Sequence, residues 1–135
     1  MIIEVLPTNY CAENWHIVEP FITEAHKYSG NDYSVDQMKM FVTLGQWMLL
    51  VAYDENRVIH GAATVSFINY PNSRIAFITA IGGRLISSPD TFKQLVTIVK
   101  NAGATKIQGA ARESIARLWK RYGFYERHTI VEIKI

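Results

Sequence analysis

The stretch Ala110–Arg127, AARESIARLWKRYGFYER, decides the fold that the sequence predicts. Apolar residues three and four positions apart predict a short helix over Glu113–Tyr122. The Gly-Phe pair at 123–124 ends that helix, because glycine suits the conformation that follows a helix C-terminus. Alternating apolar and charged residues then predict a strand region over Tyr125–Ile135.

The rest of the chain alternates between helical and strand patterns. Ser34 and Gln37 form a capping box that opens one helix, and Ser88-Pro89-Asp90 opens another. Pro20 is expected to kink or split the first helix. The predicted elements upstream of Ala110 are strands over Ile2–Leu6, Trp47–Tyr53, Val58–Asn69, Arg74–Ile81 and Thr105–Gln108, and helices over Ala12–Tyr28 (ended by Ser29-Gly30-Asn31), from Ser34 to Gly45 and from Ser88 to Gly103.

This order, β-α-α-β-β-β-α-β-α-β, predicts an α/β (α+β) fold: a mixed, mostly antiparallel sheet flanked by helices. At 135 residues, without a linker or a repeat, the chain fits a single domain over 1–135.

Composition narrows the classes of function. A net charge of +2 is too small to indicate nucleic-acid binding by itself. The longest apolar runs, Trp47–Tyr53 and Ile75–Ile81, are too short to span a membrane. A single cysteine, Cys11, excludes an internal disulfide and argues against a cysteine metal site. We therefore expect no metal and no membrane contact, and a reducing cytoplasm as the location.

The stretch Ala110–Arg127 resembles the last helix of the GCN5-related N-acetyltransferases (GNATs), in which a helix ending in Leu-Tyr-x-x-x-Gly-Phe closes the acyl-CoA site. The order of elements is also the GNAT order, so the resemblance covers almost the whole chain. It implies a GNAT-like fold and an acetyl-CoA site between the strands Ile75–Ile81 and Thr105–Gln108.

The phosphate-binding loop departs from the family pattern. GNAT enzymes have Arg/Gln-x-x-Gly-x-Gly/Ala there, whose backbone amides and following helix N-terminus hold the CoA pyrophosphate. In this chain Pro89 supplies no amide hydrogen, and the Asp90 carboxylate would repel the anion. The resemblance implies the cofactor-binding candidates Ile81, Gly82, Gly83, Arg84, Ser88 and Trp119.

The catalytic positions depart as well. Aligned on Gly123-Phe124, Trp119 stands where the family has the tyrosine that protonates the CoA thiolate, and Arg112 stands at an asparagine position. Indole does not give up its proton at useful pH. The remaining catalytic candidates are Tyr122 as acid and His60 as base, although a histidine in an apolar strand is more often a packed or edge residue.

Two functions remain, and we favour the second. The first is an acetyl-CoA-dependent N-acetyltransferase that acts on a small-molecule or protein amine. The second is a weakly catalytic or non-catalytic GNAT-fold protein that acts through a protein partner. This chain is similar to small GNAT-like proteins of tailed phages in its length, in the Arg112…Gly123-Phe124 spacing and in lacking the phosphate-binding loop. That similarity implies a virion, assembly or accessory role in a host cell.

Two surface features stay open. The cations around the last helix, Arg112, Arg117, Lys120 and Arg121, form either a solvated face or a contact for an acidic protein, the CoA 3′-phosphate or nucleic acid. The alternating strand Ile130–Ile135 either pairs across a homodimer or forms the sheet edge of one monomer.

Overall fold

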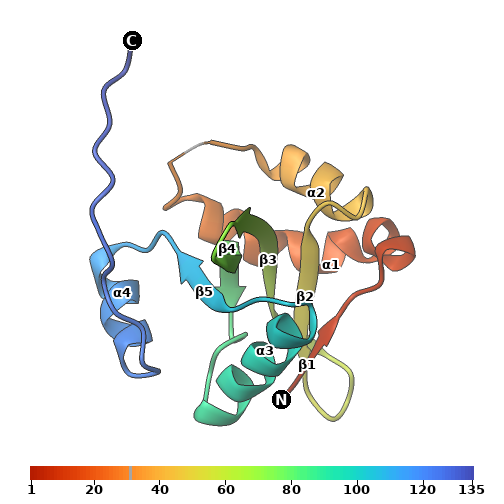
Figure 1. The fold of residues 1–135 in the computed structure, drawn as a ribbon. Coiled ribbons are helices and arrows are strands. Elements are labelled where there is room, and N and C mark those ends of the chain that lie inside the picture. The colour runs from red at the N-terminus through yellow and green to blue at the C-terminus, as the bar shows by residue number, and fades with distance from the viewer. Residues whose placement is uncertain (31) are drawn as a thin grey trace.

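The computed structural model, which describes residues 1–30 and 32–135, is built on one five-stranded sheet whose strands follow chain order (Figure 1). The first three pairs of neighbouring strands are antiparallel, and the last pair is parallel. The predicted mixed, mostly antiparallel sheet is therefore confirmed. The strands are β1 (Ile2–Val5), β2 (Met48–Tyr53), β3 (Ile59–Tyr70), β4 (Ser73–Gly83) and β5 (Lys106–Gly109).

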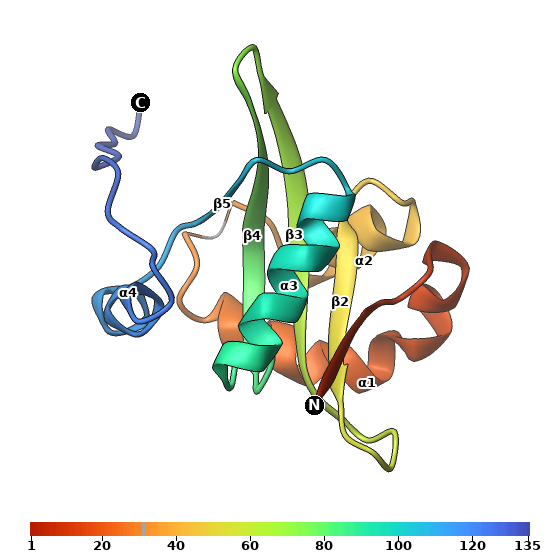
Figure 2. The same cartoon turned by 60° about the horizontal axis from the view of Figure 1, so that its bottom comes forward.

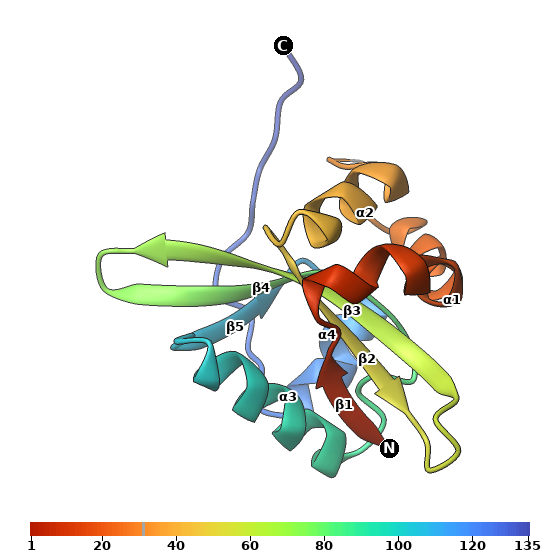
Figure 3. The ribbon, with the colours of Figure 1, turned by 90° about the vertical axis from the view of Figure 1, so that its right-hand side faces the viewer.

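Helices cover both faces of the sheet. In Figures 2 and 3, α1 and α2 lie on one face and α3 on the other, while α4 follows β5 at the sheet edge. The sheet separates two clusters of buried side chains, one under α3 and one under α1 and α2. None of the described helices is both long and apolar enough to cross a membrane. The helices are α1 (Thr8–His26), α2 (Val35–Thr43), α3 (Pro89–Asn101) and α4 (Glu113–Lys120).

Helix starts follow the sequence signals, and the proline does not split its helix. Ser34 and Ser88 both form capping boxes at the N-termini of α2 and α3. Helix α1 runs unbroken through Pro20, so the alternative of two separate helices is wrong. Its buried residues Trp15, Val18 and Ile22 lie on both sides of the proline, so packing against the sheet stabilises both halves as helix. Asn31, part of the predicted helix end, lies outside the described residues.

The predicted terminal strand is wrong for the single chain. No strand follows α4, and residues 121–135 pair with none of the described strands. The alternating pattern is present in the sequence, but a strand also needs a hydrogen-bonded neighbour, and the chain after α4 runs away from the sheet in all three views (Figures 1, 2 and 3).

Candidate functional site

The candidate site opens where β4 and β5 part. Their parallel pairing begins at Ile75 and ends with Ile78 opposite Gly109. At the same level β4 carries an extra residue, because Thr64 of β3 faces Ala80 while Val65 faces Ile78. The residue between them, Thr79, forms a bulge. A bulge bends its strand, so β4 turns away from β5 at this point.

The bulge is fixed by a pair of threonine hydroxyls. Thr79 Oγ1 donates to the Thr64 carbonyl at 2.9 Å, and the two hydroxyl oxygens lie 2.7 Å apart. Thr64 is fully buried, so its hydroxyl needs this partner. The hydrogen bonds therefore hold the extra residue in one conformation.

A cleft of about 290 Å³ lies between the parting strands. One wall is the distal half of β4, and the other is the segment that leads from β5 into α4. The end of α1 and the turn after it complete the rim. The lining residues are Glu24, Ala25, Tyr28, Ser29, Ile78, Thr79, Ala80, Ile81, Gly82, Gly83, Ala110, Ala111, Arg112, Ile115 and Trp119.

Trp119 forms the base of this cleft on the α4 side. Its side chain is only 6% exposed, and its ring centroid lies 5.2 Å from that of Phe124. The indole fits because position 109 is glycine: a Cβ there would lie 2.8 Å from a ring carbon of Trp119. Trp119 is thus a core residue with one side on the cleft, where the family has a tyrosine.

An arginine–aromatic contact lies at the rim of the cleft. The Arg112 guanidinium sits 3.7 Å from the centre of the Tyr28 ring. Arg112 precedes α4, and Tyr28 follows α1, so the contact joins two segments that are far apart in sequence. A cation over an aromatic face is attractive by about 0.5–1 kcal/mol at exposed sites. This contact holds the two sides of the rim together.

The loop from β4 to α3 is packed down onto the start of β3. The Arg84 amide donates to the His60 carbonyl at 2.8 Å, and the Leu85 side chain is fully buried. A Cβ at Gly61 would lie 2.5 Å from the Leu85 nitrogen, so backbone passes directly over β3. Gly83 has a φ of +66° at the turn into this loop, a conformation that favours glycine.

Backbone amides of this loop already have acceptors within the chain. The Ser87 and Ser88 amides donate to Thr91 Oγ1 at 3.0 and 3.1 Å, and the Thr91 amide donates to Ser88 Oγ at 3.2 Å. Pro89 has no amide hydrogen. An anion at this helix N-terminus would therefore compete with existing hydrogen bonds.

Asp90 stands in the first turn of α3, where a carboxylate interacts favourably with the helix dipole. Its Oδ2 accepts a hydrogen bond from Gln94 Nε2 at 2.9 Å. Because the position nearest the dipole already carries a negative charge, a bound phosphate would meet repulsion there.

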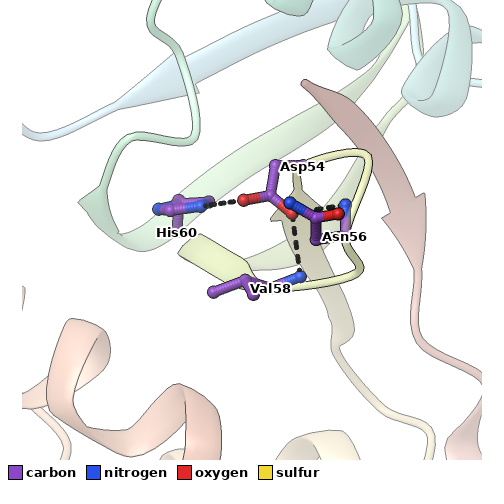
Figure 4. A network of polar contacts seen from close by, with 4 residues as sticks. All are labelled: Asp54, Asn56, Val58 and His60. Carbon is purple, nitrogen blue, oxygen red and sulfur yellow. Dashed lines mark hydrogen bonds and ion pairs between the residues drawn. The ribbon is translucent and has the colours of Figure 1, made fainter.

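His60 lies at the start of β3, where its side chain faces the turn from β2 (Figure 4). Its Nε2 is 2.7 Å from Asp54 Oδ2. The other Asp54 oxygen accepts from the Asn56 and Val58 amides. The hydrogen bonds from His60 and from Val58 lower the pKa of Asp54 below its usual value. His60 is not among the residues that line the cleft.

Tyr122 also faces another part of the molecule. Its ring centroid is 5.0 Å from that of Phe92 on α3, and it lines a separate hollow of about 260 Å³. The structure thus gathers Ile81, Gly82, Gly83 and Trp119 around the cleft and leaves both catalytic candidates outside its lining. Arg84 and Ser88 lie in the adjoining loop, outside the lining as well.

The sequence did not reveal three features of the site: the bulge at Thr79, the rim residue Tyr28 and the fit of Gly109 to Trp119. A bulge depends on pairing between strands, which a single strand pattern does not encode. Among the described residues, no group of three His, Cys, Asp or Glu side chains is arranged to hold a metal ion.

No protein-family model matches the sequence, and no curated protein matches it significantly. Solved structures do match over nearly the full length of both chains. A predicted acetyltransferase from Clostridium acetobutylicum, solved with acetyl-CoA, is 16% identical over 98% of this chain and 95% of its own, with a TM-score of 0.67.

Two aminoglycoside acetyltransferases match similarly. One, from an uncultured soil metagenomic sample and in complex with sisomicin, is 13% identical over 99% of this chain and 95% of its own, with a TM-score of 0.70. The other, a 6′-N-acetyltransferase from Acinetobacter baumannii, is 17% identical over 99% and 97%, with a TM-score of 0.64. At these identities the matches establish architecture only. The chain therefore has the GNAT acetyltransferase fold.

Proposed function

We propose that this GNAT-fold protein has a degenerate CoA site, transfers acetyl groups weakly or not at all, and acts through contacts with another protein. The observation that carries the proposal is the state of the β4–α3 loop. Hydrogen bonds within the chain already use the amides of Arg84, Ser87, Ser88 and Thr91. Pro89 and Asp90 remove a donor and add a negative charge at the same helix N-terminus.

The consequence for catalysis follows from where CoA carries its charge. In acetyl-CoA the ionised groups are all in the 3′-phospho-ADP part, which enzymes of this fold hold at this loop. Without phosphate binding at the loop, only contacts between the cleft and the acyl-pantetheine arm would hold the cofactor. We expect millimolar rather than micromolar affinity, which is a loss of about 4 kcal/mol.

A thiol-release assay tests this proposal. The purified protein is incubated with saturating acetyl-CoA and a panel of polyamines, aminoglycosides and basic peptides, and free CoA thiol is measured. We expect no release above the enzyme-free rate, with unchanged values for the variants His60→Ala and Tyr122→Phe. Turnover above background that either variant abolishes would overturn the proposal and identify that residue as catalytic.

An active N-acetyltransferase is the second candidate, and the intact cleft favours it. A cleft of about 290 Å³ lies between the parting strands, where an acyl-pantetheine arm would bind. In such a reaction the neutral amine nitrogen attacks the thioester carbonyl carbon, the C–S bond breaks, and the CoA thiolate leaves. Among the described lining residues, Glu24 is the one carboxylate, paired with Lys27 at 2.7 Å. It is the candidate to receive the amine proton, and Glu24→Gln should abolish any turnover found.

For the protein-binding function, α4 is the surface we propose. Arg117 and Lys120 have side chains 68% and 49% exposed, and their ion-pair partners, Glu113 and Glu126, are exposed as well. Such pairs contribute little to stability, so the cations are available to an acidic partner. The sequence resemblance to small tailed-phage proteins supports a virion, assembly or accessory role for such a contact.

Charge reversal tests that surface. Immobilised Arg117→Glu/Lys120→Glu protein should lose the proteins that the wild type retains from its source, while Lys93→Glu on α3 should retain them. Equal retention by both variants would move the interface away from α4. Circular dichroism checks that each variant is folded.

A further inference from the structure

The positive charge of the chain is concentrated at its C-terminal end. Residues 110–135 contain six Lys or Arg and three Asp or Glu, whereas residues 1–109 contain eight and nine. The chain is therefore slightly acidic as far as β5, and its net positive charge comes from α4 and the segments around it. The cations in and next to α4, all of them exposed, are Arg112, Arg117, Lys120, Arg121 and Arg127.

The same helix forms one wall of the cleft. Ile115 and Trp119 line the cleft from α4, and Arg112 lines it just before the helix begins. Since α4 has eight residues, Arg112 at the rim and Lys120 at the far end lie about 12 Å apart along the helix axis. A partner that buries about 800 Å² of this surface would cover the cations and the rim together.

The inside of the cleft suits an uncharged ligand. Its lining has two charged side chains, and both lie at the rim with partners of their own. Glu24 pairs with Lys27 at 2.7 Å, and the Arg112 guanidinium lies over the Tyr28 ring. The walls between them are formed largely by alanine, glycine and isoleucine. Pantetheine is an uncharged chain with two amide groups, so its chemistry matches this lining.

Acyl groups are carried on pantetheine in two chemical settings. In CoA the arm ends in 3′-phospho-ADP, which needs a phosphate-binding loop. On a carrier protein the arm is joined through one phosphate to a serine, and the acidic surface of the carrier makes the remaining contacts. A cleft that lies beside a cationic helix and lacks free loop amides matches the second setting in both parts.

We propose that the cleft takes the acyl-pantetheine arm of an acidic carrier protein, which docks on α4 through Arg117, Lys120 and Arg121. This inference rests on the proposed function, because it takes the β4–α3 loop as unable to hold the phosphates of CoA, and it names the acidic partner. Opposite charges would guide and orient the docking. Asp90 at the N-terminus of α3 disfavours an acidic partner there, which places the contact on the α4 side.

Fluorescence anisotropy with one labelled acidic carrier protein tests the inference. The carrier is prepared without its arm, with a free 4′-phosphopantetheine arm, and with an acetylated arm. We expect the acetylated form to bind at least about tenfold more tightly than the form without an arm, because only an arm reaches the cleft. Binding of all forms should weaken as the salt concentration rises. Equal affinity for the acetylated and armless forms would overturn the proposal.

Variants separate the helix surface from the cleft. Arg117→Glu/Lys120→Glu should weaken binding of every form at least about tenfold. The matched control Lys93→Glu/Lys100→Glu makes the same charge change at exposed positions of α3 and should stay within about twofold. Ala111→Trp fills the cleft from an exposed lining position and should abolish the preference for the acetylated arm. Equal melting temperatures check that the variants are folded. A preference that survives Ala111→Trp, or equal loss in both charge variants, would overturn the proposal.

Titration calorimetry with acetyl-CoA alone distinguishes this inference from the proposed function. Millimolar affinity for acetyl-CoA together with tighter binding of the acetylated carrier supports both. Millimolar affinity for acetyl-CoA without carrier binding would overturn the inference and leave the degenerate CoA site standing. Micromolar affinity for acetyl-CoA would overturn both, because the loop would then hold phosphate.

Discussion

The cleft between β4 and β5 and the loop from β4 to α3 lie at the same end of one strand, yet they are built in opposite ways. The cleft is held open: a bulge at Thr79 bends β4, and pairing with β5 stops at Ile78. The loop is held closed: the Ser87 and Ser88 amides donate to the Thr91 hydroxyl of α3, and Leu85 anchors the loop in the core.

The difference indicates that the cleft and the β4–α3 loop can change independently of each other. The cleft depends on strand geometry, which core packing maintains whether or not a ligand binds. An anion site depends on amides left without internal partners. Under the proposed function, Pro89 and Asp90 weaken such a site at the N-terminus of α3 without disturbing the core, so the chain would keep the GNAT fold and its cleft without holding phosphate.

The largest expected effect is on the cleft side. Trp119→Ala should lower the free energy of unfolding by about 3–5 kcal/mol, because it empties the space between Gly109 and Phe124. Urea unfolding followed by far-ultraviolet circular dichroism measures the change. Trp119→Phe, which keeps a ring, should cost less than half as much. A loss below about 1 kcal/mol for Trp119→Ala would mean that Trp119 is not a packed wall of the cleft.

A smaller loss is expected where the cleft meets α1. A Cβ at Gly82 would overlap the carbonyl oxygen of Phe21, which is backbone and yields little. We expect Gly82→Ala to cost about 1–3 kcal/mol in the same unfolding experiment. Gly30→Ala is the matched control, because the nearest atom to its Cβ would be 3.6 Å away. Equal stability of the two variants would show that α1 is free to shift.

On the loop side, removing one charge should partly restore anion binding. Asp90→Asn keeps a side-chain acceptor for Gln94 but removes the negative charge from the N-terminus of α3. We expect it to tighten acetyl-CoA binding about tenfold, as measured by titration calorimetry.

The control for this charge change is Asp36→Asn, which makes the same substitution in the first turn of α2. It should leave acetyl-CoA affinity unchanged. If both variants tighten binding equally, the effect comes from net charge and not from the loop.

The smallest effect concerns the Asp54–His60 pair, because the His60 carbonyl accepts the hydrogen bond from the Arg84 amide of the loop. Hydrogen bonds from His60 and the Val58 amide lower the pKa of Asp54, so the charged carboxylate stabilises the folded state near neutral pH. This contribution is lost as the pH falls below about 4, through the folded-state pKa.

Asp54→Asn should therefore be less stable than the wild type at neutral pH, and the difference should shrink as the pH falls. Unfolding midpoints measured across the acid range test this. A stability difference that stays constant with pH would mean that the charge of Asp54 does not stabilise the folded state.

The sequence was sufficient for most of the fold because its signals are local. Capping boxes at Ser34 and Ser88 and the alternation of strand patterns depend on neighbouring residues, and both appear in the structure. Pro20 does not split α1, because packing on both sides of the proline outweighs a local helix breaker. The predicted terminal strand is wrong for the single chain because an alternating pattern shows which residues suit a strand but does not determine which sheet edge they would pair with.

The site was less predictable for the same reason. Glycines at 82 and 83 and the indole at 119 could be placed near the cleft through the family resemblance. The Tyr28–Arg112 contact and the internal bonding of the loop join residues through the folded chain, so no spacing in the sequence encodes them.

Titration calorimetry with two ligands, acetyl-CoA and acetyl-pantetheine, tests the central claim most directly. The two share the arm that fits the cleft, and only acetyl-CoA carries the 3′-phospho-ADP that the loop would hold. If the cleft is retained and the phosphate grip is lost, the two dissociation constants should agree within about threefold, in the millimolar range. Acetyl-CoA binding that is about a hundredfold tighter than acetyl-pantetheine binding would show that the loop holds phosphate, and would contradict the account.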